Sequence, residues 1–176
     1  MKIHQHGAHL DQMMRQTRQH HVQLSAMADH KANMVLTIAS IVLTLTVPRL
    51  HSADVRLADV VLVGFCLVTM GLAAYVVMPK VPFISKSQAQ DNASNPTFNL
   101  LFFGDFAHLD YPEYERRMET LMNDPNEVYA AQVREVYALG CFLAKKKYRF
   151  LRLAYLAFFT GLAASAIIML LTGGVF

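Results

Sequence analysis

Three long runs of uncharged, apolar residues constrain this chain most. They cover Met34 to Val47, Val60 to Met78 and Leu153 to Thr172, with 14, 19 and 20 residues respectively. The hydrocarbon core of a bilayer is about 30 Å thick, and a helix needs roughly 20 predominantly apolar residues to cross it. All 13 carboxylates and all 16 lysine and arginine side chains lie outside these runs. The chain is therefore predicted to be an all-α membrane protein with three transmembrane helices.

The first run is short for a span, and the basic residues indicate whether it crosses. If all three runs cross, Met1–Asn33 and Pro79–Leu151 lie on one side and carry most of the lysine and arginine residues. The opposite side then holds only Arg49 and Arg56. Because basic side chains accumulate on the cytoplasmic side of a membrane, the N-terminus is predicted to be cytoplasmic and the C-terminus external.

These runs divide the chain into seven predicted segments. They are a cytoplasmic helix (1–33), transmembrane helix 1 (34–50), an external loop (51–59), transmembrane helix 2 (60–78), a cytoplasmic insert with a long helix (79–150), transmembrane helix 3 (151–172) and an external tail (173–176).

Two of the spans are predicted to extend as helices into the cytoplasm. No proline or glycine interrupts Ala8–Val47, which gives one helix of 40 residues with Asp11 and Arg15 spaced for an ion pair. The sequence Asp124-Pro125-Asn126-Glu127 supplies an N-cap, a proline at the first helical position and an acidic side chain in the first turn. A second helix should run from there into the last span. The cytoplasmic parts, Ala8–Asn33 and Pro125–Phe150, each have 26 residues and are predicted to pack side by side as a stalk.

The segment between the second and third spans differs from the predicted long helices in composition and in predicted local structure. Residues 82–96 are rich in Ser, Asn, Gln and Asp and predict a loop, and Asp110 to Met122 predicts a short helix. An aromatic cluster lies between them and is predicted to act as a coupling insert that packs against the stalk or the headgroup region. Its candidate residues are Asn99, Phe102, Phe103 and Gly104.

Three polar residues stand immediately before the first apolar run. Asp29 and Asn33 share one helix face, whereas Lys31 points elsewhere. Charged groups at this depth often mark ion paths or paired contacts, so these residues are candidates for the cytoplasmic mouth of a conducting path. In an oligomer, Asp29 could meet Lys31 of a neighbouring copy. The alternative is that all three extend toward the lipid headgroups.

The last span carries two further features. Ala157, Gly161 and Ser165 recur every four residues and form a stripe of small side chains that lets helices approach closely, within one subunit or between subunits. A basic cluster precedes the span and is predicted to contact anionic lipid, or alternatively a phosphate-bearing ligand. The cluster consists of Lys145, Lys146, Lys147, Arg149 and Arg152.

Histidines are frequent near the N-terminus and raise the question of a metal site. His4, His6, His9, His20, His21 and His30 all precede the first span. Their spacing is not that of a structural metal site, so solvated histidines are expected and no metal or other cofactor is predicted. No catalytic constellation or phosphate loop is recognisable, and no nucleic-acid partner is expected. Cys66 and Cys141 lie at different depths and are expected to be unpaired.

Three stretches together resemble the Pycsar effector family of bacterial membrane proteins. The first is Val22 to Met34 (VQLSAMADHKANM), and the second is Asn99 to Phe106 (NLLFFGDF). The third comprises Tyr137-Ala138-Leu139-Gly140, Ala144-Lys145-Lys146-Lys147-Tyr148 and Leu151-Arg152. The resemblance extends from about residue 15 to 165 and therefore concerns the whole domain.

The resemblance implies a role in antiphage defence at the bacterial inner membrane. In that family a cyclase makes cyclic CMP or cyclic UMP on infection, and a membrane effector responds by compromising the membrane. This chain has no segment that predicts a cyclic-nucleotide-binding barrel or an HD phosphohydrolase, so it resembles a stand-alone version. Its trigger would be a cyclic pyrimidine nucleotide or a separate sensor protein.

The sequence therefore favours a non-enzymatic, oligomeric membrane effector that impairs membrane integrity or conducts ions when triggered. Two alternatives stay open. The chain could be an anchor or adaptor for a soluble signalling enzyme, or a constitutive ion or metal transporter.

Overall fold

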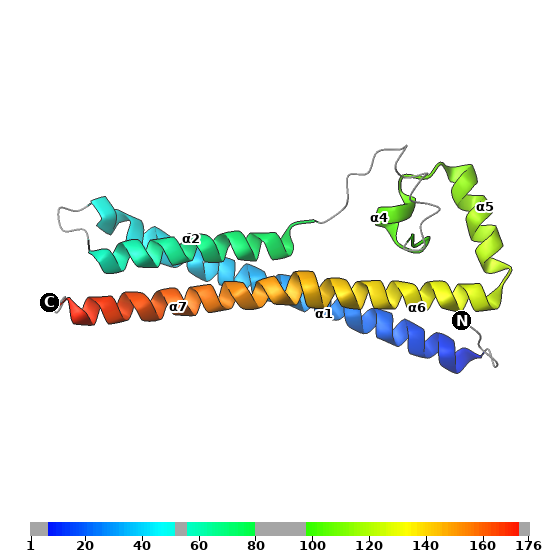
Figure 1. Cartoon of the computed structure of the whole chain (residues 1–176), viewed down its shortest axis with the longest axis horizontal. Helices are drawn as coiled ribbons and strands as arrows, with labels where there is room; N and C mark the ends of the chain where they lie inside the picture. The colour runs from blue at the N-terminus through cyan, green and yellow to red at the C-terminus, as the bar shows by residue number, and fades with distance from the viewer. Residues whose placement is uncertain (1–6, 52–55, 80–97, 173–176) are drawn as a thin grey trace. The chain divides into compact units, whose positions relative to one another are not determined.

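The computed structural model describes residues 7–51, 56–79 and 98–172 (Figure 1). The described residues form helices and connecting turns, with no strand among them. Three helical stretches in these ranges are long and apolar enough to cross a membrane, namely Ala8–His51, Leu57–Val77 and Pro125–Leu171. The predicted all-α fold with three membrane helices is confirmed. The sides of the membrane that the segments face stay predictions.

Helix α1 extends from Ala8 to Thr46, within one residue of the predicted end. A short 3₁₀ helix, η1 (Val47–His51), follows it and contains Pro48, which cannot donate a backbone hydrogen bond. The second span is α2 (Leu57–Val77). The loop predicted at 82–96 and the tail at 173–176 lie outside the described residues.

The C-terminal helical path begins at the predicted signal. Helix α6 (Pro125–Phe142) starts at the proline, and the Asn126 N–H donates to the Asp124 carboxylate at 2.9 Å, as an N-cap requires. A π-helical segment, η2 (Leu143–Tyr148), continues directly into α7 (Arg149–Leu171). The expected continuous helix into the last span is confirmed, with a π-helical interruption that the sequence did not indicate.

The chain folds as two compact units. Unit 1 comprises 1–22 and 79–141, and unit 2 comprises 23–78 and 142–176. In each unit, a part of α1 packs against a part of the C-terminal helical path. Asp11 and Arg18 contact α6 in unit 1, whereas Leu24 and Asp29 contact η2 in unit 2. The predicted side-by-side packing of the two helices is present within both units.

Small side chains at the centre of unit 2 let its helices approach closely. One core cluster combines residues of α1, α2 and α7, and α2 runs alongside α7 (Figure 1). Its buried members are Val35, Ala39, Cys66, Ala73, Ala154 and Phe158. A second cluster joins Ala28 and Ala32 to Val76 and Leu151. Bulky apolar side chains such as Ile41, Leu67 and Leu170 face outward, which suits helices surrounded by lipid.

Unit 1 contains two short helices before α6. They are α4 (Phe103–Phe106) and α5 (Tyr111–Met122). Helix α5 has Pro112 in its first turn and lies where the sequence predicted a short helix. The Asp110 side chain makes no capping hydrogen bond, so the proline and backbone bonds define this helix start.

Candidate functional site

A buried lysine meets an aspartate where the first apolar run begins. The Lys147 ammonium donates to both carboxylate oxygens of Asp29, at 2.7 and 2.6 Å, and to the Ser25 hydroxyl at 2.8 Å. The Lys147 side chain is 11% exposed and the Asp29 side chain 34%. An ammonium group has three N–H donors, so every donor of Lys147 has an acceptor. We refer to these three residues as the ion-pair cluster.

The local helix geometry explains why Lys147, rather than its lysine neighbours, is buried. Leu143, Lys147 and Leu151 recur every four residues and are all buried, whereas Lys145 and Lys146 are exposed. In a π-helix the hydrogen bonds join residues five apart, which widens the turn. The wider turn of η2 keeps Leu143 and Lys147 on one face against α1. The Tyr148 hydroxyl donates to the Leu24 carbonyl at 3.1 Å and fixes η2 to the same stretch of α1.

A paired charge at this position is costly to assemble and to disrupt. Removing two ions from water carries a large desolvation penalty, which only close pairing and complete hydrogen bonding offset. The ion-pair cluster meets both conditions. Because such a pair is weak evidence for stability, its presence beside apolar runs is better explained by specificity or function.

Lys31 and Asn33, the other two residues of the predicted cytoplasmic mouth, do not take part in the ion-pair cluster. The side chains of Lys31 and Asn33 are exposed. Within the chain, Lys147 occupies the position beside Asp29, and the expected contact with Lys31 of a neighbouring copy stays a prediction. The Lys31 backbone carbonyl lies 3.4 Å from the Tyr155 hydroxyl, which donates to it.

The remaining members of the basic cluster are exposed on their helices. Lys145, Lys146, Arg149 and Arg152 all point away from the core of unit 2. Their contact with lipid or phosphate stays a prediction, whereas Lys147 is engaged inside the chain.

The small-residue stripe of α7 makes one very close contact. Gly161 is buried, and a Cβ added there would overlap the Cβ of Phe65 on α2. Ala157 and Ser165 are half-buried. At Gly161 the stripe therefore serves packing within one chain, and a role between chains stays a prediction.

Unit 1 holds a polar contact surface between α1 and α6. The Tyr129 hydroxyl donates to the Asp11 carboxylate at 2.6 Å, and this bond raises the pKa of Tyr129. Arg18 pairs with Glu135 at 3.0 Å, and the Glu135 side chain is only 12% exposed. The expected ion pair of Asp11 with Arg15 is not among the ion pairs of the described residues, where Tyr129 contacts the carboxylate instead.

A cavity of about 340 Å³ opens beside these contacts. The side-chain oxygen of Gln132 is buried without a hydrogen-bond partner among the described residues. Charged, polar and apolar groups of unit 1 line the cavity, namely Asp11, Met14, Arg15, Arg18, Leu101, Gln132, Glu135 and Val136.

The predicted coupling insert forms a tight turn in unit 1. Asn99 is buried, its backbone N–H donates to Asp105 at 2.9 Å, and its side-chain oxygen accepts from the Leu101 N–H at 3.0 Å. Gly104 is buried, and a Cβ there would overlap the Phe102 ring. Phe102 and Phe103 are exposed. Asn99 and Gly104 thus shape the turn, and the coupling role of the insert stays a prediction.

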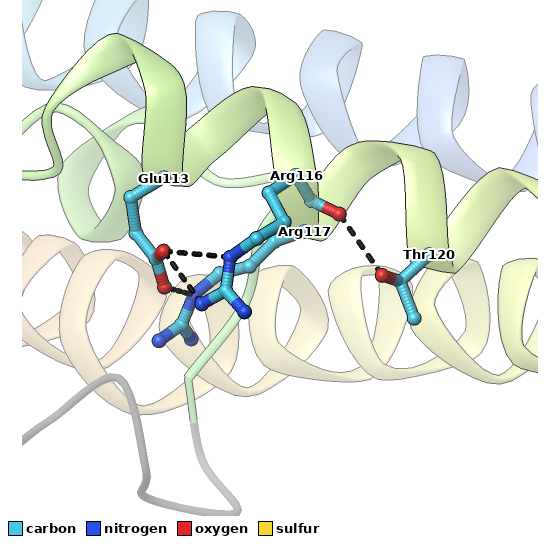
Figure 2. Close-up of polar contacts among 4 residues, drawn as sticks. All are labelled: Glu113, Arg116, Arg117 and Thr120. Carbon is cyan, nitrogen blue, oxygen red and sulfur yellow. Dashed lines mark hydrogen bonds and ion pairs between the residues drawn. The ribbon is translucent and has the colours of Figure 1, made fainter.

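A charge network on α5 supports this insert. Glu113 accepts from Arg116 at 2.6 Å and from Arg117 at 2.5 Å, and the Thr120 hydroxyl donates to the Arg116 carbonyl. Figure 2 shows these contacts. The hydrogen bonds from Arg117 and Arg116 lower the pKa of Glu113. The Arg117 guanidinium also lies 5.7 Å from the ring centre of Phe98, which joins α5 to the segment that leads into the insert.

The histidines do not assemble with other ligands in the described part of the chain. No group of three or more His, Cys, Asp or Glu side chains there is placed to hold a metal ion. His4 and His6 lie outside the described residues. His9, His20 and His30 are exposed, and His21 is half-buried beside Gly140.

Comparison with known families identifies the chain. A family model described as the Pycsar effector protein domain matches residues 12–173. This chain belongs to that family. The Pycsar effector domain is a transmembrane domain of antiphage defence and is not a known catalytic domain, which together with the three apolar helices indicates a membrane location. No curated protein and no solved structure matched the chain.

The matched span of this Pycsar effector domain contains every residue of the ion-pair cluster. Sequence reasoning singled out Asp29 and Lys147 separately and missed Ser25 and the pairing itself. The four-residue recurrence of Leu143, Lys147 and Leu151 was the available signal. Tyr129, Gln132 and Glu135 were also missed, because a helix without strong periodicity gives little indication of which polar side chains face a partner.

Proposed function

We propose that this Pycsar effector domain is a non-enzymatic, oligomeric effector of the bacterial inner membrane that lets ions or small solutes cross when triggered. The observation that carries the proposal is the ion-pair cluster of Asp29, Lys147 and Ser25 at the start of the first apolar run. Ionisable groups next to membrane spans are costly, and those retained in a bundle usually serve transport or switching. The N-terminus is proposed to be cytoplasmic and the C-terminus external.

Oligomerisation follows from the small number of spans. Three helices packed around small side chains such as Ala39, Ala73 and Ala154 leave no room for water at their centre. A path for ions would therefore have to form between several copies. The outward-facing bulky apolar side chains provide surface for contacts with lipid or with other copies.

The proposed trigger is a cyclic pyrimidine nucleotide or a separate sensor protein, acting on unit 1. Arg15 lines the cavity of that unit and could bind a phosphate, whereas Arg18 is paired with Glu135, and the unpartnered oxygen of Gln132 suits an amino donor. Its volume of about 340 Å³ lies at the lower end of the range for small-ligand sites. A signal there would reach unit 2 through α1 and the C-terminal helical path, which both units share.

Dye-loaded vesicles test this function. The purified protein is reconstituted into vesicles of phosphatidylethanolamine and phosphatidylglycerol that contain a small fluorescent anion. Release is recorded without nucleotide, with cyclic CMP and with cyclic UMP. The variant Asp29→Asn removes the charge of the cluster at constant shape, and Gln23→Ala changes an exposed side chain of the same helix as a control.

Release by the wild type and by Gln23→Ala, but not by Asp29→Asn, would support the proposal. Absence of release from wild-type vesicles under all three conditions, with the protein inserted, would refute it and favour an anchoring role. Equal release by Asp29→Asn would refute the part assigned to the ion-pair cluster.

A further inference from the structure

A stripe of polar side chains follows one face of α1 from the residue before the first apolar run into that run. Asn33, Thr37, Ser40 and Thr44 are separated by four, three and four residues. This spacing returns to the same face of an α-helix. We call these four residues the α1 polar stripe.

The α1 polar stripe faces away from the core of its own chain. Ala28, Ala32, Val35 and Ala39 form the buried face of α1. With 3.6 residues per turn, the mean direction of the stripe lies about 140° from that of the buried face. Three of its side chains are exposed, and Ser40 is half-buried with a weak contact of 3.9 Å to the sulfur of Met70.

The hydroxyl groups are only partly satisfied within the helix. Each donates to the carbonyl four residues before it, at 2.9 Å for Thr37, 2.8 Å for Ser40 and 2.9 Å for Thr44. This satisfies the donors and leaves the oxygen lone pairs and the Asn33 amide directed outward. Polar groups at this depth normally face a bundle interior or a water-filled cavity rather than hydrocarbon.

The neighbouring face of α1 has the opposite character. Met34, Ile38, Ile41 and Leu45 repeat the same spacing, are all exposed, and lie about 100° from the polar stripe. Among the described residues of the other two spans, no comparable polar row is exposed, because Thr69 of α2 is buried, and in α7 the exposed Thr160 and the half-buried Ser165 lie on different faces. The outer surface of α1 thus carries one exposed apolar row and one largely exposed polar row.

We propose that the α1 polar stripe lines a water-filled path enclosed by several copies of this chain, and that α1 is the helix that contacts hydrated ions or small solutes. The inference rests on the proposed function and adds the identity of the lining helix. The stripe is neutral, so it would favour hydrated solutes without strong selection by charge. From Asn33 to Thr44 it covers about 16 Å, roughly half the hydrocarbon thickness.

Cysteine accessibility tests the assignment. In a background with Cys66→Ala and Cys141→Ser, single cysteines replace Thr37 or Thr44 in the stripe, and Ile38 or Ile41 in the apolar row. The reconstituted proteins are treated with a charged, membrane-impermeant methanethiosulfonate while dye release is recorded. Thr37→Cys and Thr44→Cys should react at least about tenfold faster than the two controls, because a charged reagent is excluded from hydrocarbon.

The outcomes separate the two proposals. Dye release with equally slow reaction at all four positions, or with faster reaction in the apolar row, would overturn the inference and leave the proposed function intact. No release by the wild type, with the protein inserted, would overturn the proposed function itself. As a second measurement in the native sequence, Thr37→Val with Thr44→Val should reduce release, whereas Ile38→Val should not. Unchanged release by the double valine variant would also overturn the inference.

Discussion

The contact between Asp29 and Lys147 can be measured by a double-mutant cycle. Asp29→Asn removes the negative charge at nearly constant volume, and Lys147→Met keeps most of the apolar stem while removing the ammonium. The double variant replaces the ion pair by an uncharged pair of similar size. Lys146→Met serves as a control, because this neighbouring side chain is exposed.

The structure sets the expected magnitudes. Asp29→Asn leaves the ammonium of Lys147, whose side chain is 11% exposed in the wild type, with the Ser25 hydroxyl and one amide oxygen as acceptors. Breaking a fully buried pair costs about 3–5 kcal/mol. Because the Asp29 side chain is 34% exposed, water can replace part of the contact, and we expect a loss of about 1–3 kcal/mol in the free energy of unfolding.

The double variant should recover part of this loss. An uncharged pair carries no desolvation penalty for ions. The double variant should therefore lose less free energy of unfolding than the two single variants lose in sum. The coupling free energy between the two positions is then expected to be about 1–2 kcal/mol.

Unfolding in mixed micelles of a mild detergent and sodium dodecyl sulfate provides the assay. The chain has no tryptophan, so circular dichroism is the suitable signal. Lys146→Met should unfold like the wild type. A coupling free energy below about 0.5 kcal/mol would show that the two groups act independently, and the reasoning on the ion-pair cluster would be refuted.

Two further predictions follow from the packing of α7 and the charges of α5. Gly161→Ala should lower the free energy of unfolding by about 1–3 kcal/mol in the same micelle assay, because the new Cβ overlaps Phe65. Gly64→Ala, where an added Cβ meets nothing within 4 Å, should be neutral or slightly stabilising, and an equal loss in both variants would contradict the packing argument. Glu113, whose pKa is lowered in the folded state, should stabilise α5 above its ordinary pKa of about 4.3 and lose this contribution as the pH falls through the lowered value. The Glu113→Gln variant should therefore lose less helicity than the wild type between about pH 5 and 2. Identical helicity of the wild type and the variant across this pH range would disprove the stabilising role of Glu113.

The helices could be predicted from the sequence because local signals determine them. The absence of proline and glycine after Ala8 predicts one long helix, and α1 ends within one residue of the predicted position. Asp124 and Pro125 likewise predict the start of α6, and the structure shows the expected capping bond. These signals act within a few residues, so they do not depend on the tertiary structure.

The pairing of side chains could not be predicted in the same way. Three consecutive lysines have equal local propensities, and the packing of η2 against α1 decides that Lys147 is the one that contacts Asp29. The contact between Gly161 and Phe65 depends on how closely α2 and α7 approach, which a periodic pattern does not give. Long-range geometry therefore decides which of the candidate residues touch.

The π-helical turn of η2 gives α7 a second possible rotational position about its own axis. Such a turn accommodates about one residue more than an α-turn, so rewinding it would rotate the downstream helix by about 100° about its axis. The rotation would separate Lys147 from Asp29 and leave this carboxylate without its counter-ion. It would also turn the aromatic side chains of α7 in a different direction relative to α2. Deleting Ala144 within η2 would remove the extra residue, so a regular α-helix would then keep α7 in its native rotational position. A disulfide engineered between α2 and α7 in the native position should therefore still form in this deletion variant.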